Sequence, residues 1–288
     1  MWNTVNEHIS QATSLDFKHT FKRQLHSPNS DKLFHICDSN RDYFVKVAQK
    51  NDLDRFESES KALTLLAHNS EFSVPTCITT GVNIEFSFSV FKWLVLDKPL
   101  PSKWDCMGKK LAKMHLDHNQ AMFGYDQDNY LASTVQPNRW HKKWHLFYAE
   151  ERIGWQLQLL AEKGIVFIEN ERLINIIKEQ LQSHIVSPSL LHGDFWRGNI
   201  GFYKSAPTLF NPACYYGDRE IDIAMSELFA PLPNEFYTAY NQLYPLSRNY
   251  EKRKAIYQLY PILNHANIYA GHYLTQAKEH IEKLTNKL

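Results

Sequence analysis

The sequence lacks the features that define several common protein classes. Its four cysteines lie far apart and form no Cys-x-x-Cys pair, which argues against a zinc knuckle or a disulfide framework. No apolar run approaches the roughly 20 residues that cross a bilayer, and the start, MWNTVNEHIS, has no basic segment followed by an apolar one. Neither charge sign dominates, because 32 Lys and Arg oppose 31 Asp and Glu. We expect a cytoplasmic protein with reduced thiols that binds neither nucleic acid nor a membrane.

The composition is that of a folded globular chain. Of its 288 residues, 43% are hydrophobic and 14% are aromatic, which excludes a disordered protein. At roughly 100–200 residues per domain, the length fits one large domain or two small ones. We find no internal repeat and no low-complexity segment.

The first ninety residues read as a sheet with one helix. Short runs of strand-forming residues at 33–37, 43–47 and 84–90 are separated by polar turns. Residues 52–68 place apolar side chains on one face at helical spacing, and Val74 before Pro75 avoids helical conformation. The pattern predicts an antiparallel sheet with a single helix packed on it.

The rest of the chain reads as mostly helical. A segment at 91–101, punctuated by two prolines, is a candidate hinge. Beyond it the pattern predicts helices at 102–118, 139–163 and 170–184, a short strand at 189–192, and further helices to the end. We therefore expect an α+β fold with two lobes, residues 1–91 and 92–288, and a ligand site at the seam between them.

The most informative stretch is LLHGDFWRGN, which contains His192, Asp194 and Asn199. Phosphoryl-transfer kinases use this His-x-Asp and Asn spacing in their catalytic loop. The aspartate accepts a proton from the acceptor hydroxyl, and the asparagine, five residues on, reaches the metal ion on the phosphates. The alternative is a polar turn whose aspartate caps nearby amides.

Two upstream residues and one downstream residue fit the same chemistry. A kinase holds the nucleotide phosphates with a strand lysine that a helix glutamate orients. Lys46 lies in the predicted strand at 43–47, and Glu59 lies in the helix that follows. A second metal ligand is expected after a strand at 207–210, where the chain has Asn211 instead of an aspartate.

These residues resemble the fructosamine kinase (ketosamine-3-kinase) family. LLHGDFWRGN followed by NPACYYGDREIDIAM is similar to the family's HGDLWSGN and DPACYYGDRE elements. Choline and aminoglycoside kinases share only the HGD and Asn core. The resemblance extends from Lys46 to the C-terminal helices, and the tryptophan-rich segment at 137–164 looks like that of bacterial members. It implies a two-lobed protein-kinase-like fold.

The resemblance also implies roles for individual residues. Asp194 would be the catalytic base, and Asn199 and Asn211 would be magnesium ligands. Lys46, supported by Glu59, would hold the ATP phosphates.

Further roles implied by the resemblance concern the adenine, the loop and the acceptor. The backbone at the hinge would meet the adenine, and two residues would support the catalytic loop. Three more would lie on the acceptor side or compensate at the metal site. The hinge residues are Phe91, Lys92 and Trp93, and the residues that would support the loop are His192 and Asp222. The three on the acceptor side or at the metal site are Trp196, Tyr216 and Asp218.

The implied activity is ATP-dependent phosphorylation of a sugar hydroxyl on a ketoamine. The substrate would be a small-molecule or protein-linked ketoamine, and the cofactors would be ATP and Mg²⁺. The 3-phosphate product of such an enzyme is unstable and releases the amine, so the role would be deglycation repair.

Two departures from the family pattern leave alternatives open. The loop expected over the phosphates, residues 26–32, has no glycine, although glycine lets backbone amides approach phosphate. Asn211 lacks the charge that magnesium favours in a ligand. The alternatives are another small-molecule kinase of the same fold and a catalytically weak, nucleotide-binding pseudokinase.

Overall fold

The computed structural model describes residues 1–27 and 31–285. The chain forms two compact units. Unit 1 comprises Met1–Lys98 and Gly201–Asn211, and unit 2 comprises Pro99–Ile200 and Pro212–Leu288. The chain first passes from one unit to the other within the segment at 91–101 that the prolines mark.

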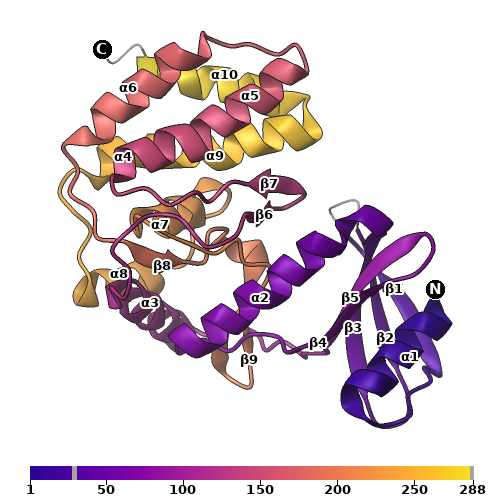
Figure 1. Ribbon diagram of the computed structural model, residues 1–288. Coiled ribbons are helices and arrows are strands. Elements are labelled where there is room, and N and C mark those ends of the chain that lie inside the picture. The colour runs from indigo at the N-terminus through magenta and orange to yellow at the C-terminus, as the bar shows by residue number, and fades with distance from the viewer. Residues whose placement is uncertain (28–30, 286–288) are drawn as a thin grey trace. The chain divides into compact units, whose positions relative to one another are not determined.

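Unit 1 contains a five-stranded antiparallel sheet with the order β1-β2-β3-β5-β4 (Figure 1). Neighbouring strands along the chain form hairpins, except that β5 inserts between β3 and β4. The strands are β1 (Phe21–Leu25), β2 (Lys32–Cys37), β3 (Asp42–Gln49), β4 (Cys77–Val82) and β5 (Phe86–Lys92).

Two helices and a short 3₁₀ turn complete the N-terminal part of unit 1. Helix α1 (Trp2–Thr13) buries Val5 and Ile9 in a core formed with β2, β3 and β5. The turn η1 (Lys50–Asp52) leads into α2 (Leu53–Asn69), which buries Phe56, Leu63 and Leu66.

Strand β3 sets the direction of Lys46. Tyr43, Val45 and Val47 alternate into the core on the α1 side of the sheet. Because successive side chains of a strand point to opposite faces, Lys46 lies on the other face.

A second hairpin joins unit 1 from far along the chain. Strands β9 (Ile200–Tyr203) and β10 (Ala206–Leu209) pair with each other. The backbone of Ser73 donates to Pro207 O and accepts from Leu209 N, both at 2.9 Å. These bonds fix Asn211, two residues beyond β10, in unit 1.

Helices dominate unit 2, where α9 packs against α5, α6, α7 and α10 (Figure 1). Among the described residues, no helix is both long and apolar enough to cross a membrane. The helices are α3 (Pro101–Leu116), α4 (Trp144–Phe147), the π-helical η2 (Tyr148–Gly154), α5 (Trp155–Glu162), α6 (Asn170–Gln182), α7 (Glu220–Leu228), α8 (Asn234–Leu243), α9 (Tyr250–Tyr269) and α10 (His272–Thr285).

Two small strand pairs support the loops of unit 2. Strand β8 (Ser189–Leu191) pairs antiparallel with β11 (Tyr215–Gly217), and β6 (Asn129–Leu131) pairs with β7 (Thr134–Gln136). A 3₁₀ turn, η3 (Arg197–Asn199), follows β8 after five residues.

The predicted α+β fold class is confirmed, because unit 1 is built on an antiparallel sheet and unit 2 is mostly helical. The expectation of a single helix in the first ninety residues was wrong, because α1 precedes the sheet. The predicted helix at 139–163 begins only at Trp144, since the backbone of His141 pairs with Phe123 in a β-bridge. Two predicted ranges match the structure to within two residues. The strand predicted at 189–192 is β8, and the helix predicted at 170–184 is α6.

Candidate active site

Asp194 lies in a tight turn between β8 and η3 of unit 2. The turn is anchored by Phe195, which is fully buried and stacks on Phe236 with ring centroids 5.6 Å apart. Gly193 has a φ of 80°, and a Cβ there would lie 2.0 Å from the carbonyl oxygen of Ala213. Only glycine fits both constraints, so the sequence HGD specifies the turn that presents Asp194.

Asn199 holds the carboxylate of Asp194. Its Nδ2 donates to Asp194 Oδ2 at 2.6 Å and to the Asp194 carbonyl oxygen at 3.0 Å. Burial raises the pKa of Asp194 to about 7, although hydrogen bonds from Asn199 and Trp196 act in the opposite direction. A carboxylate with a pKa near neutrality is well matched to general-base work.

Asp222 of α7 fastens the turn from inside unit 2. Its carboxylate is fully buried and accepts the main-chain amides of His192 at 2.8 Å and Gly193 at 2.9 Å. His115 Nε2 lies 3.2 Å from Asp222 Oδ2, and His115 Nδ1 lies 2.9 Å from the Tyr240 hydroxyl. Burial lowers the pKa of His115, so the neutral ring donates from Nε2 to the carboxylate and accepts from Tyr240.

An aromatic group that the sequence reading missed adjoins Trp196. The ring of Phe229 lies 5.5 Å from Trp196 and stacks on His265 at 5.2 Å. Tyr269 and Tyr273 continue the group, 5.6 and 4.9 Å from His265. Burial, with smaller contributions from Tyr273 and Asp194, raises the pKa of Tyr269, which places Tyr269 within electrostatic reach of Asp194.

No motif in the sequence predicts that these aromatic residues lie near the loop that carries Asp194 and Trp196. Trp196 and Phe229 are separated by three strands and a helix, and His265 lies a further helix away. The spacing of His265, Tyr269 and Tyr273 at every fourth residue was the only available hint.

Tyr216 and Asp218, both expected near the acceptor, lie in different surroundings. Tyr216 is half-buried in β11, where its backbone pairs with Gly124 and its ring lies 6.2 Å from Trp140. Asp218 is buried, and both of its carboxylate oxygens accept hydrogen bonds.

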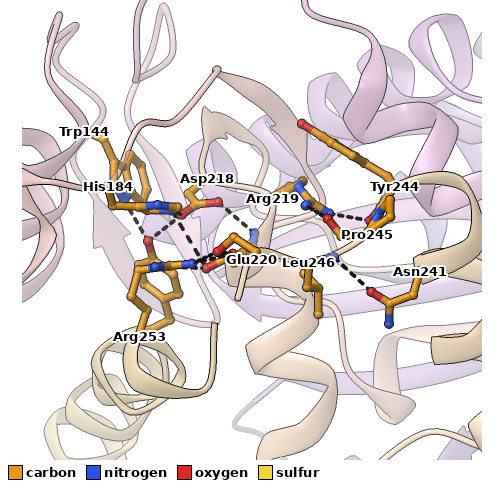
Figure 2. Close-up of polar contacts among 12 residues, drawn as sticks. Trp144, His184, Asp218, Arg219, Glu220, Asn241, Tyr244, Pro245, Leu246 and Arg253 are labelled. Carbon is orange, nitrogen blue, oxygen red and sulfur yellow. Dashed lines mark hydrogen bonds and ion pairs between the residues drawn. The ribbon is translucent and has the colours of Figure 1, made fainter. Parts of the chain in front are cut away.

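The partners of Asp218 form a polar network that joins the segment after α6, the start of α7 and α9 (Figure 2). His184 Nε2 and the Tyr257 hydroxyl bond to Asp218 Oδ2, and the amide of Glu220 bonds to Oδ1. Burial alone would raise the pKa of Asp218, but the bonds from His184 and Tyr257 hold it below its ordinary value. Arg253 binds Glu220 through two bonds of 2.8 Å. The network satisfies its own charges and acts as a brace between helices.

Unit 1 contains a cavity of about 210 Å³. Its wall is mostly apolar, with two lysines, one glutamate and one asparagine among the lining residues. These residues are Leu25, Phe44, Lys46, Glu59, Pro75, Phe91, Lys92, Trp93, Leu94, Leu96, Phe210 and Asn211. The three predicted hinge residues and three predicted phosphate-side residues of unit 1 therefore share one cavity.

Lys46, Glu59 and Asn211 meet at the polar part of this cavity. Lys46 Nζ donates to Glu59 Oε1 at 2.6 Å, to Glu59 Oε2 at 2.7 Å and to Asn211 Oδ1 at 2.6 Å. The lysine and glutamate side chains are only 12% and 14% exposed.

The loop expected over the phosphates is described only in part. Residues 28–30 lie outside the described residues. At its end, Asp31 pairs with Arg55 of α2, with the closest contact at 2.6 Å.

The residues expected to bind magnesium do not supply the ligands that this ion favours. Asn199 and Asn211 are neutral amides, whereas magnesium sites are built on carboxylates. Asn211 Oδ1 already accepts from an ammonium group. Glu59, the one carboxylate of the cavity lining, binds Lys46 through both oxygens.

Comparison with known sequences gives full-length matches. A profile of the family described as fructosamine kinase matches residues 1–287. A probable ketoamine kinase of Vibrio parahaemolyticus is 43% identical over 286 residues, which are 99% of each chain. A probable ketoamine kinase of Escherichia coli is 35% identical over 285 residues, again 99% of each chain.

Comparison with solved structures also gives matches over almost the full length of the chain. A crystal structure of a Haemophilus somnus protein is 34% identical, has a TM-score of 0.94, and is matched over 99% of this chain and 97% of that chain. Choline kinase LicA from Streptococcus pneumoniae is similar in fold alone, with 17% identity, a TM-score of 0.64 and 99% coverage of each chain.

Proposed function

The chain belongs to the fructosamine kinase family, and we propose that it transfers the γ-phosphoryl group of ATP to a sugar hydroxyl of a ketoamine. The observation that carries this proposal is the state of Asp194. Its carboxylate is held by Asn199 and has a pKa of about 7, as a base for a hydroxyl requires.

Unit 1 is proposed as the nucleotide-binding part. The apolar wall of its cavity suits a purine ring, and the proposed hinge residues Phe91, Lys92 and Trp93 belong to that lining. Lys46, oriented by Glu59, is the cation for the phosphates.

Unit 2 is proposed to carry out the transfer. Asp194 accepts the proton of the acceptor hydroxyl while the oxygen forms a bond to the γ-phosphorus and the bond from that phosphorus to the β-bridging oxygen breaks. ADP is the leaving group. Asp222 and His192 keep the turn in place, so Asp194 contributes by position as much as by basicity.

The aromatic group next to Asp194 suits a ketoamine. Trp196, Phe229 and Tyr269 offer ring faces for the apolar face of a sugar. The amine of a ketoamine carries a positive charge when protonated, which aromatic faces also attract. We propose this group for the acceptor, with a small-molecule or protein-linked ketoamine as substrate.

Magnesium is the ion expected with ATP, but the chain's donor set does not fit it. Asn199 and Asn211 offer neutral amide oxygens, and the transfer step requires no metal ligand from the protein. The metal would be held mainly by the nucleotide.

The test is a transfer assay with a panel of acceptors. The purified chain is incubated with ATP, magnesium and either fructosyl-lysine, choline or an aminoglycoside, and ADP formation is measured. We expect ADP with fructosyl-lysine alone, followed by release of the amine as the 3-phosphate decomposes. Turnover with choline or an aminoglycoside instead would support another small-molecule kinase.

A second candidate function rests on Asn211. A protein without the charged metal ligand could bind nucleotide without transferring phosphate. ATP binding without ADP formation on any acceptor would favour this candidate.

A further inference from the structure

Lys46 has no spare hydrogen-bond donor in unit 1. An ammonium group has three N–H donors, and two oxygens of Glu59 and one of Asn211 lie 2.6 to 2.7 Å from Lys46 Nζ. A phosphate that binds Lys46 must therefore displace one of these acceptors.

Asn211 is the acceptor that a phosphate displaces most easily. The bonds of Lys46 to Glu59 join opposite full charges, whereas its bond to Asn211 joins a charge to a neutral amide, so the bonds to the Glu59 carboxylate are retained. The amide of Asn211 also has an NH₂ group, which donates to anions. Rotation of the Asn211 side-chain amide by half a turn exchanges the positions of Oδ1 and Nδ2. Nδ2 then faces the incoming phosphate.

The charged residues that line the cavity carry a net positive charge, which favours the binding of an anion. Lys46 and Lys92 oppose only Glu59 among the residues that line it. An aspartate at position 211 would cancel the excess positive charge and repel a polyphosphate unless a divalent cation lay between them. Asn211 leaves the excess in place.

The backbone conformation at position 211 does not explain why the residue is asparagine and not aspartate. Asn211 has a φ of 47°, a region where both Asn and Asp are enriched among the non-glycine residues. Aspartate would fit the same conformation at almost the same volume. The difference that asparagine makes is one of charge and of hydrogen-bond donors.

We infer that the cavity of unit 1 binds the phosphates of a nucleoside triphosphate without a metal ion between them and residue 211, with Asn211 donating directly to a phosphate oxygen. The inference rests on the proposed function for the identity of the ligand. It assigns Asn211 to the phosphate itself, in contrast to the metal-binding role that the family resemblance implies.

The test is the affinity of the full-length protein for ATP, measured by calorimetry in EDTA and in excess magnesium. We expect the wild-type Kd to differ by less than about threefold between the two conditions, because no protein carboxylate has to be bridged. Asn211→Asp should bind about tenfold or more weakly than the wild type in EDTA, and magnesium should restore most of the loss. Asn211→Gly keeps the backbone freedom and loses the donor, so it should bind about tenfold more weakly in both conditions.

Asn40→Asp is the matched control. Asn40 is exposed in the β2–β3 turn of the same unit, outside the cavity lining, so the same added charge should leave both affinities unchanged. Wild-type binding that requires magnesium, or an Asn211→Asp variant that matches the wild type in EDTA, would overturn the inference. ATP bound in EDTA without transfer to any ketoamine would uphold it and refute the proposed function. Absence of binding in both conditions would refute both.

Discussion

Asp194 works against stability at the pH where it would act. Burial raises its pKa from 3.8 to about 7, so above neutrality the turn holds an ionised carboxylate that water would solvate better. Such a cost is expected at a site selected for reactivity.

The first prediction concerns the pH dependence of stability. Because the folded-state pKa lies above the unfolded one, the folded protein binds the proton more tightly, and the contribution of Asp194 to stability falls as pH rises from about 4 to about 7. Asp194→Asn removes this loss and keeps an acceptor for Asn199. The Tm difference between variant and wild type should therefore be more positive at about pH 8 than at about pH 5. Thermal scans at both pH values measure it, and equal differences would contradict the assigned pKa.

The second prediction concerns Lys46. Lys46→Met removes the cation of the cavity and leaves the Glu59 carboxylate, only 14% exposed, without its partner. ATP should bind about tenfold to a hundredfold more weakly, because a hydrogen bond between charged groups is lost and an uncompensated negative charge remains. Calorimetry measures the affinity.

Two further variants separate charge from misfolding. The double variant Lys46→Met/Glu59→Gln removes the stranded charge and should bind ATP more tightly than Lys46→Met. Lys113→Met alters an exposed lysine of α3 in unit 2 and should bind as the wild type does. Wild-type affinity in Lys46→Met would show that the lysine does not face the nucleotide.

Sequence reasoning located some residues of the site because their roles impose local spacing. Asp194 and Asn199 belong to one turn, and the bond between their side chains follows from that turn. The partnership of Lys46 with Asn211 spans 165 positions, and only a known kinase pattern suggested it. Phe229 and His265 reach the loop through helix packing, which no spacing in the sequence records.

At the scale of elements, α7 positions the catalytic loop. The third prediction is that Asp222→Asn lowers the free energy of unfolding by about 2–4 kcal/mol, because an NH₂ group would face the amide that Asp222 Oδ2 now accepts. Denaturant unfolding measures the loss. Glu227→Gln on the same helix alters a carboxylate that is 20% exposed and paired with Lys254, and should cost less than about 1 kcal/mol. Equal losses would contradict the bracing role.

The elements that the sequence predicts correctly have apolar residues at a regular spacing. In β3, Tyr43, Val45 and Val47 alternate into the core, and α2 keeps its buried apolar face over about three turns. Helix α1 was missed because it buries only three side chains and otherwise presents polar residues. The start of α4 was misplaced because residues 139–143 have helical composition but are held by the β-bridge at His141. Tertiary pairing overrides local propensity there.

At the scale of the whole molecule, the chain divides its proposed task between two units. Unit 1 has a cavity with a lysine–glutamate pair, and unit 2 has a braced turn with a carboxylate of raised pKa. The sequence match over residues 1–287 spans both units. The net charge of +1 on the whole chain gives no hint of the excess positive charge of the cavity, which arises from local placement.

The most direct test of the central claim compares wild type and Asp194→Asn in phosphoryl transfer from ATP to fructosyl-lysine, followed by ³¹P NMR, with ATP affinity measured for both. We predict that the wild type forms ADP and a sugar phosphate ester that is detected before it decomposes. The variant should bind ATP as tightly but turn over about 10²–10⁴ times more slowly, the usual contribution of a positioned general base. Equal turnover in the two proteins, or ATP binding without any ester in the wild type, would contradict the account.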